Sequence, residues 1–136
     1  MSVKHFTTKD VETWYQHTDR QMFLGDVLDA SNSDHLTVGF GRYKKGESNE
    51  WVVTYDEVNV VTKGSFTFRT AERTVTAKAG EVLFITKGTK VTYEAHEDME
   101  IVYVTYPHFM EAQRNSEHAK LLDAFHPVET EPRRTT

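Results

Sequence analysis

The chain has 136 residues, with 16 Lys and Arg, 21 Asp and Glu, and a formal net charge of −5. This length suits a single domain with its own hydrophobic core, and the acidic balance argues against a nucleic-acid partner. The chain contains no cysteine, which excludes disulfides, thiolate metal sites and cysteine nucleophiles. No apolar run approaches the ~20 residues of a membrane helix, and residues 1–6 lack the character of a secretory signal. We therefore expect a cytoplasmic protein that binds neither membrane nor nucleic acid.

A short helix is predicted near the N-terminus. Residues 7–10 read Thr-Thr-Lys-Asp, which can cap a helical turn, and Val11, Trp14, Tyr15 and Thr18 follow at helical spacing.

From residue 36 the apolar period changes to two, which is typical of strands with one buried face. Strand patterns, separated by turn signals, cover residues 36–43, 51–55, 58–62, 65–70, 73–77, 82–85, 90–95 and 100–106. Short strands at this spacing predict an all-β sandwich or barrel. No crossover helix separates the strands, so a parallel βαβ sheet is excluded.

The last part of the chain has a different character. A short second helix is predicted within residues 110–125, where Leu121, Leu122 and Phe125 form an apolar stripe. Residues 127–136 are polar, and we expect them to form a disordered tail. A single domain is therefore expected over residues 1–126.

The central segment carries two motifs. The stretch from Gly46 to Gly64 has Glu57 seven residues before its end, and a second stretch runs from Gly80 to Gly88. Together they resemble the two-motif signature of the cupin superfamily, whose first motif has two histidines and a glutamate and whose second has a third histidine. The resemblance implies a double-stranded β-helix, which is a small jelly-roll barrel, here with short N- and C-terminal helices.

Longer stretches narrow the resemblance to one group. Residues 55–64, 79–88 and 102–107 are similar to the EutQ-like cupins of ethanolamine utilization, and residues 24–30 and 38–40 also fit that group. The similar region therefore covers most of the chain.

The sequence departs from this group at two positions. It has Asn59 where the group tends to have an acid, and Thr86 where the group tends to have proline. The resemblance implies a role in ethanolamine metabolism and an acetate kinase activity. No Gly-rich phosphate-binding loop is present in the sequence, so the spacing of residues alone assigns nothing to ATP.

The metal-ligand positions of the cupin motifs no longer carry histidine. The first two fall at Trp51 and Val53, or at Glu50 and Val52 with a longer spacing, and the third falls at Val91. Glu57 is retained, but a transition-metal site needs three or four donor atoms. We therefore expect no metal and no other cofactor.

A relocated metal site is the alternative. His96 or His108 could join Glu57 as ligands. His96 lies in a predicted turn and His108 follows a proline, so both are expected at the surface, outside the barrel.

Strand alternation predicts an aromatic pocket around Glu57. Its ligand-binding residues would be Trp51, Tyr55, Tyr93, Tyr103 and Tyr106. Burial among aromatic rings would raise the pKa of the Glu57 carboxyl, and Glu57 would then act as a catalytic residue by exchanging protons. Alternatively the carboxylate binds a cation beside Trp51, or it is a structural group satisfied by backbone N–H groups or tyrosine hydroxyls.

Other aromatic and acidic residues are expected to have structural roles only. Phe66, Phe68 and Phe84 are expected in the core because large apolar side chains are mostly buried. Asp56 is expected on the solvated face of its strand.

Three functions are compatible with the sequence. The first is a metal-free EutQ-like cupin that binds a small polar metabolite, with acetate kinase-like or acid/base activity at Glu57. The second is a metal-dependent isomerase, lyase or dioxygenase with relocated ligands. The third is a non-enzymatic assembly or sensor protein with a solid core. Because uncovered sheet edges favour pairing, we also expect a homodimer.

Overall fold

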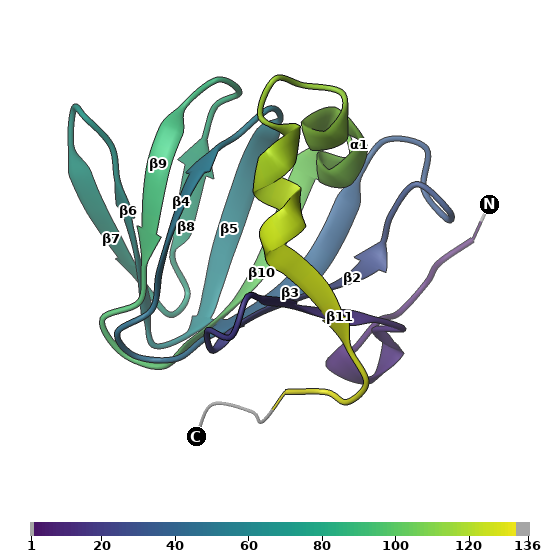
Figure 1. Ribbon diagram of the computed structural model, residues 1–136. Helices are drawn as coiled ribbons and strands as arrows, with labels where there is room; N and C mark the ends of the chain where they lie inside the picture. Colours follow the sequence, from purple (N-terminus) through teal and green to yellow (C-terminus); the bar gives the residue numbers. More distant parts are fainter. Residues whose placement is uncertain (1, 133–136) are drawn as a thin grey trace.

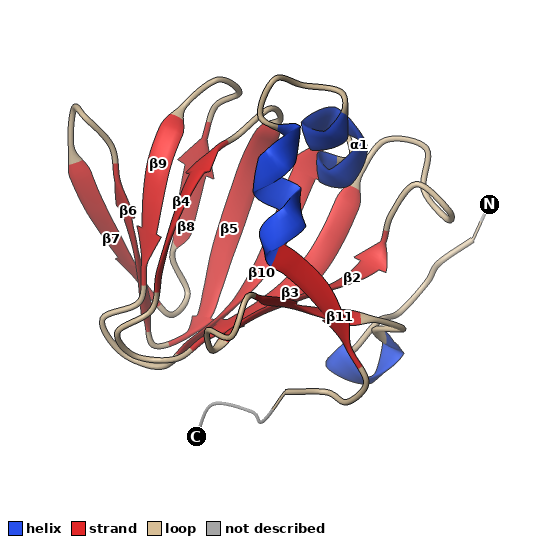
Figure 2. Cartoon of the chain, viewed as in Figure 1, coloured by secondary structure: helices blue, strands red, loops and turns tan. Residues whose placement is uncertain are grey.

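A computed structural model describes residues 2–132 of the chain (Figure 1). The regular structure of these residues is mainly antiparallel strands, with short helices near both ends (Figure 2). The all-β class predicted from the sequence is therefore confirmed. No helix in the described part of the chain is long and apolar enough to cross a bilayer.

Two antiparallel sheets face each other. The seven-stranded sheet has the order β11-β1-β2-β3-β10-β5-β8, and the four-stranded sheet has the order β4-β9-β6-β7. The strands are β1 (Trp14–His17), β2 (Met22–Leu28), β3 (Thr37–Tyr43), β4 (Ser48–Val52), β5 (Asp56–Lys63), β6 (Ser65–Arg69), β7 (Thr74–Lys78), β8 (Val82–Ile85), β9 (Lys90–Glu94), β10 (Met99–Tyr106) and β11 (Phe125–Val128).

The N-terminal segment differs from its predicted helix. A single 3-10 turn, η1 (Thr8–Asp10), is capped by Thr7, whose side chain accepts a hydrogen bond from the Lys9 N–H at 3.2 Å. Trp14 and the residues after it form β1 instead of continuing the helix, because β2 and β11 pair with β1 on both sides. Pairing across the sheet thus overrides a local helical spacing.

The C-terminal segment is also divided differently from the prediction. The predicted helix becomes α1 (Phe109–Arg114) and a 3-10 helix, η2 (Ala119–Ala124), and β11 then pairs with β1. Residues 127 and 128 lie in β11, beyond the domain end expected at residue 126. The rest of the expected tail is described as far as residue 132, and residues 133–136 lie outside the described part.

A buried arginine holds the end of this segment on the seven-stranded sheet. The Arg42 guanidinium donates to a Glu131 carboxylate oxygen at 3.1 Å and to the Pro132 carbonyl at 2.7 Å. The same side chain pairs with Glu100 at 3.3 Å and lies 4.9 Å from the centre of the Trp14 ring. The segment after β11 therefore has specific polar contacts.

The core lies between the two sheets. Phe66 and Phe68 are buried there, as predicted, and their rings meet edge to face at 5.1 Å. Phe84 is 60% exposed, which contradicts its predicted core position. The reason is strand alternation, since Leu83 and Ile85 are the residues of β8 that point inward.

Candidate functional site

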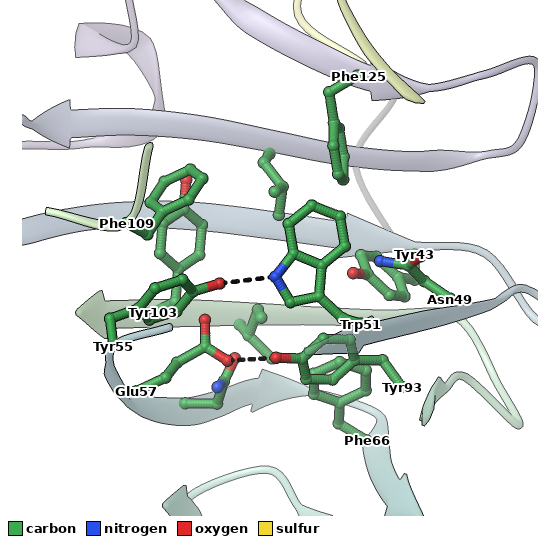
Figure 3. Close-up of a pocket in the computed structure, with 13 residues that line it drawn as sticks. Tyr43, Asn49, Trp51, Tyr55, Glu57, Phe66, Tyr93, Tyr103, Phe109 and Phe125 are labelled. Atoms are coloured by element: carbon green, nitrogen blue, oxygen red, sulfur yellow. Dashed lines mark hydrogen bonds between the residues drawn. The ribbon is translucent and has the colours of Figure 1, made fainter. Parts of the chain in front are cut away.

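A cavity of about 40 Å³ lies inside the barrel, between the two sheets. Its walls include Trp51, Tyr55, Glu57, Tyr93 and Tyr103 (Figure 3), which are five of the six site residues predicted from the sequence.

Strand geometry brings these side chains together. Trp51 is on β4, opposite Val91 of β9, and Tyr93 follows on the same inward face of β9. Glu57 is near the start of β5, and Tyr103 is on β10, which pairs with β5. Because alternate residues of each strand point inward, the period-two pattern predicted this set once the cupin motifs had indicated which face of each strand is the inner one.

The Glu57 carboxyl is buried at the centre of the site. The Tyr93 hydroxyl donates to its Oε1 at 2.8 Å, as the dashed line in Figure 3 shows. Burial raises the pKa of Glu57 above its ordinary value, while the Tyr93 hydrogen bond and the Asn59 amide partly offset that rise. The carboxyl therefore keeps its proton to a higher pH than an exposed glutamate does.

A second polar pair lies beside it. The Trp51 Nε1–H donates to the Tyr55 hydroxyl oxygen at 3.0 Å. Tyr55 is an acceptor in this bond, so its own O–H can donate to a further group. Burial raises the pKa of Tyr55 well above its ordinary value, which keeps this hydroxyl neutral.

Asn59 is a site residue that the sequence prediction missed. Its side chain is 2% exposed and lines the cavity, close enough to Glu57 to lower the pKa of that carboxyl, but its Nδ2 makes no hydrogen bond of ordinary length and angle with a described residue. A buried amide donor without a partner costs about 1–3 kcal/mol. The sequence did contain a signal for Asn59, because EutQ-like cupins tend to have an acid at this position. An amide offers hydrogen-bond donors there, whereas an acid offers mainly acceptors.

Tyr106 does not join the site. Its side chain is 57% exposed, and its position opposite Asp56 places it on the outer face of the sheet. Tyr103 and Thr105 are the inward residues at this end of β10, so Tyr106 points the other way. The prediction that Tyr106 lines the pocket was therefore wrong, whereas Asp56 is exposed as predicted.

The two histidines considered as relocated ligands lie outside the cavity lining. His96 is exposed, but His108 is buried, with Nδ1 2.9 Å from the Thr37 hydroxyl and Nε2 2.8 Å from the Ser33 carbonyl oxygen. The predicted surface position of His108 was wrong, because the loop before β3 covers it. Among residues 2–132, no group of three or more His, Asp or Glu side chains is arranged to hold a metal ion.

A second carboxyl, Asp26, lies near the site and was not predicted. The Tyr103 hydroxyl donates a hydrogen bond to Asp26 Oδ1. Burial raises the pKa of Asp26 to about 7, although the Tyr103 hydrogen bond opposes the rise. The available signal was the Leu-Gly-Asp sequence at residues 24–26, but β2 was not predicted as a strand, so the direction of this side chain was not deduced.

Comparison with known proteins gives the family. The family model "Ethanolamine utilisation protein EutQ" matches residues 2–111. The protein "Acetate kinase EutQ" of Clostridioides difficile (strain 630) is 30% identical over 86 residues, which are 63% of this chain and 54% of that relative. The chain therefore spans about half the length of that relative.

Solved structures agree with this relationship. The structure of the Clostridium difficile EutQ protein has a TM-score of 0.66 at 30% identity, covering 74% of this chain and 72% of that one. A cupin superfamily protein from Desulfitobacterium hafniense shares the fold, with a TM-score of 0.58 at 13% identity over 68% of this chain and 82% of its own. The chain therefore belongs to the ethanolamine utilisation protein EutQ family and has the cupin fold that its motifs predicted.

Proposed function

We propose that the protein binds a small polar metabolite in the barrel cavity, without the usual cupin metal, and that Glu57 exchanges a proton with this ligand. The observation that carries the proposal is the buried, unpartnered Nδ2 of Asn59 beside the Glu57 carboxyl. A ligand with an acceptor oxygen would satisfy that donor.

The polar groups of the cavity favour a ligand with acceptor oxygens. Asn59 and Tyr55 each offer an N–H or O–H that no described residue accepts. Glu57 in its protonated form would add a third donor. A carboxylate, carbonyl or phosphoryl oxygen complements such a set.

The size of the cavity limits the ligand. A single buried water requires about 10–15 Å³, so a cavity of about 40 Å³ has room for a few waters or for a ligand of a few non-hydrogen atoms. A larger metabolite would enter only in part. This space beside Trp51 and Glu57 also favours ligand binding over a solid-core assembly or sensor protein.

The name of the C. difficile relative suggests the reaction to test. An acetate kinase moves a phosphoryl group between acetyl phosphate and a nucleotide, and acetate and acetyl phosphate carry the acceptor oxygens described above. The sequence contains no recognised motif for binding the nucleotide of such a reaction. We therefore propose acetate or acetyl phosphate as the first ligands to examine, with acid/base chemistry at Glu57 as the more general activity.

Equilibrium titration tests the proposal. Acetate, acetyl phosphate and ethanolamine would be titrated into the wild type and into the Glu57→Gln and Asn59→Leu variants. We expect Asn59→Leu to weaken binding of the preferred ligand by about 10-fold or more, since it removes a buried hydrogen bond to that ligand. We expect Glu57→Gln to change the affinity and to remove its dependence on pH, since an amide still donates a hydrogen bond but cannot exchange a proton. Tyr106→Phe, on the exposed face, is the control and should bind as the wild type does. Equal affinity in all four proteins would contradict the proposed site.

A further inference from the structure

A second, larger cleft lies outside the inner cavity. It has a volume of about 200 Å³ and is lined by β1, β2 and the C-terminal segment. Leu24, Phe109 and Phe125 line both spaces, so they form the wall between them. Figure 3 shows Phe109 and Phe125 among the residues that line the inner cavity. The proposed metabolite site does not use this outer cleft.

Asp26 is the polar group built into the outer cleft. Its side chain lines the cleft from β2, and its Oδ1 accepts the Tyr103 hydrogen bond. Its Oδ2 has no hydrogen-bond partner among residues 2–132. One carboxylate oxygen is thus fixed in place while the other is available to a ligand.

The fold makes room for this arrangement. Asp26 of β2, Gly39 of β3 and Tyr103 of β10 lie opposite one another across three neighbouring strands. A Cβ atom at Gly39 would collide with the Tyr103 hydroxyl. Since Gly39 has no side chain, the tyrosine reaches across β3 to the carboxyl.

The surroundings of Asp26 favour positive charge. The pKa of Asp26 is raised to about 7, mainly by burial and in part by the negative charges of Asp29 and Glu111. His108 acts in the opposite direction, and the Tyr103 hydrogen bond also lowers the pKa. The other polar groups lining the cleft are Tyr15 on β1 and Arg114 on α1, and Arg114 is exposed, so solvent weakens its effect.

We propose that the outer cleft binds a small primary ammonium compound, with Asp26 as its charged anchor and the aromatic rings of the wall around its apolar part. The free Oδ2 accepts an ammonium N–H, and the added positive charge offsets the mutual repulsion of the three carboxylates. Tyr15, Phe109 and Phe125 provide rings beside which an alkylammonium group is stabilised.

The affinity of this site for an ammonium ligand should depend on pH. An alkylammonium ion stays charged throughout the neutral range, since amines of this kind have pKa values near that of lysine, about 10.4. Asp26, with a pKa of about 7, must lose its proton before it can pair with the ammonium ion. The apparent affinity therefore rises as the pH increases through about 7, in proportion to the ionised fraction of Asp26.

NMR titration with ethylammonium chloride tests this inference. For the wild type we expect the apparent Kd to be about tenfold lower at pH 8 than at pH 6, and ethanol, the neutral analogue, should not bind. Asp26→Asn should lose binding at both pH values, and Tyr103→Phe should move the pH midpoint upward, because the hydroxyl lowers the pKa of Asp26. Glu50→Gln, an exposed carboxyl on β4, is the matched control and should leave binding unchanged.

The inference would be overturned by a lack of saturable binding by the wild type or by an affinity that does not change between pH 6 and 8. Binding by a folded Asp26→Asn protein equal to that of the wild type would overturn it as well. Loss of ethylammonium binding in Glu57→Gln alone would place the amine in the inner cavity and also refute the outer site. If Asp26→Asn fails to fold, the pH dependence of the wild type and the shift in Tyr103→Phe still decide the question.

Discussion

Two carboxyl groups show how surroundings set the chemistry of a single residue. Glu57 and Asp26 each accept a hydrogen bond from a tyrosine hydroxyl, of Tyr93 and Tyr103 respectively. In both, burial is the largest cause of a raised pKa, and the tyrosine hydrogen bond only reduces the rise. The two groups therefore retain protons at pH values where exposed carboxyls have lost them.

The raised pKa of Asp26 predicts how its replacement changes stability with pH. Between pH 3.8, its ordinary pKa, and about 7, its pKa in the fold, the folded state binds more protons than the unfolded state. The free energy of unfolding therefore falls as the pH rises through this window. Asp26→Asn removes this contribution. The free energy of unfolding of the variant, relative to that of the wild type, should therefore be higher at pH 8 than at pH 4.5. Urea unfolding at both pH values measures the difference, and an unchanged pH dependence would contradict the assignment.

At the residue scale, prediction from sequence was successful where strand alternation alone decides the direction of a side chain. It identified Trp51, Tyr55, Glu57, Tyr93 and Tyr103 as neighbours in one cavity. It did not identify groups that depend on contacts between distant strands. Asp26, for example, is joined to the site only because the Tyr103 side chain crosses the space left by Gly39 on the strand between them.

At the scale of the elements, the close packing around Gly39 of β3 predicts that a side chain at this position destabilises the fold. An alanine at Gly39 would place its Cβ against the Tyr103 hydroxyl and 2.6 Å from the Gly25 carbonyl oxygen. The backbone carbonyl cannot rotate away as a side chain can, so we expect Gly39→Ala to lower the free energy of unfolding by about 1–3 kcal/mol. It should also break the bond between Tyr103 and Asp26.

Chemical denaturation and the NMR titration of Asp26 check both effects. Gly41→Ala is the control on the same strand, because its Cβ would meet the Ile101 side chain, which can adjust. The control should leave the titration of Asp26 unchanged. A Gly39→Ala protein with wild-type stability and an unaltered Asp26 titration would contradict the proposed packing.

The helix α1 is held on the barrel by one fully buried side chain. The Gln113 amide donates to the Val52 carbonyl at 3.1 Å and to the His118 carbonyl at 3.2 Å, and its Oε1 accepts from the Thr54 hydroxyl at 2.8 Å. Gln113→Leu removes all three bonds and should lower the free energy of unfolding by about 2–4 kcal/mol. Gln16→Leu, at a half-buried position with a single bond to the Arg20 carbonyl, should cost less in the same denaturant assay. Equal losses in the two variants would contradict this role for Gln113.

The elements themselves were predicted best in the middle of the chain. The segment 82–85 is a strand in both the prediction and the structure, because glycine-containing turns define its ends. At the two ends of the chain the local pattern was misleading. Trp14 belongs to a strand only because β11, more than a hundred residues later, supplies a pairing partner, and no local pattern contains that information.

At the scale of the whole molecule, the homodimer remains a prediction. In the described chain β8 is the last strand of its sheet, and it exposes Val82 at 59% and Phe84 at 60%. We propose that a second copy of the chain covers this edge, since a two-fold axis would bring the same apolar residues together. Light scattering should give twice the mass of one chain, and Phe84→Lys should reduce it to that of one chain. A wild-type protein that is monomeric at ~100 μM would contradict the proposal.

The central claim is that the barrel holds an organic ligand in the place where most cupins bind a metal. The most direct test is a crystal structure of the protein purified without chelators, with anomalous diffraction recorded at the absorption edges of the common transition metals. We predict no anomalous peak at Glu57, and a small molecule or ordered water accepting a hydrogen bond from Asn59 Nδ2. A transition-metal ion bound to the Glu57 carboxylate inside the cavity would contradict the claim.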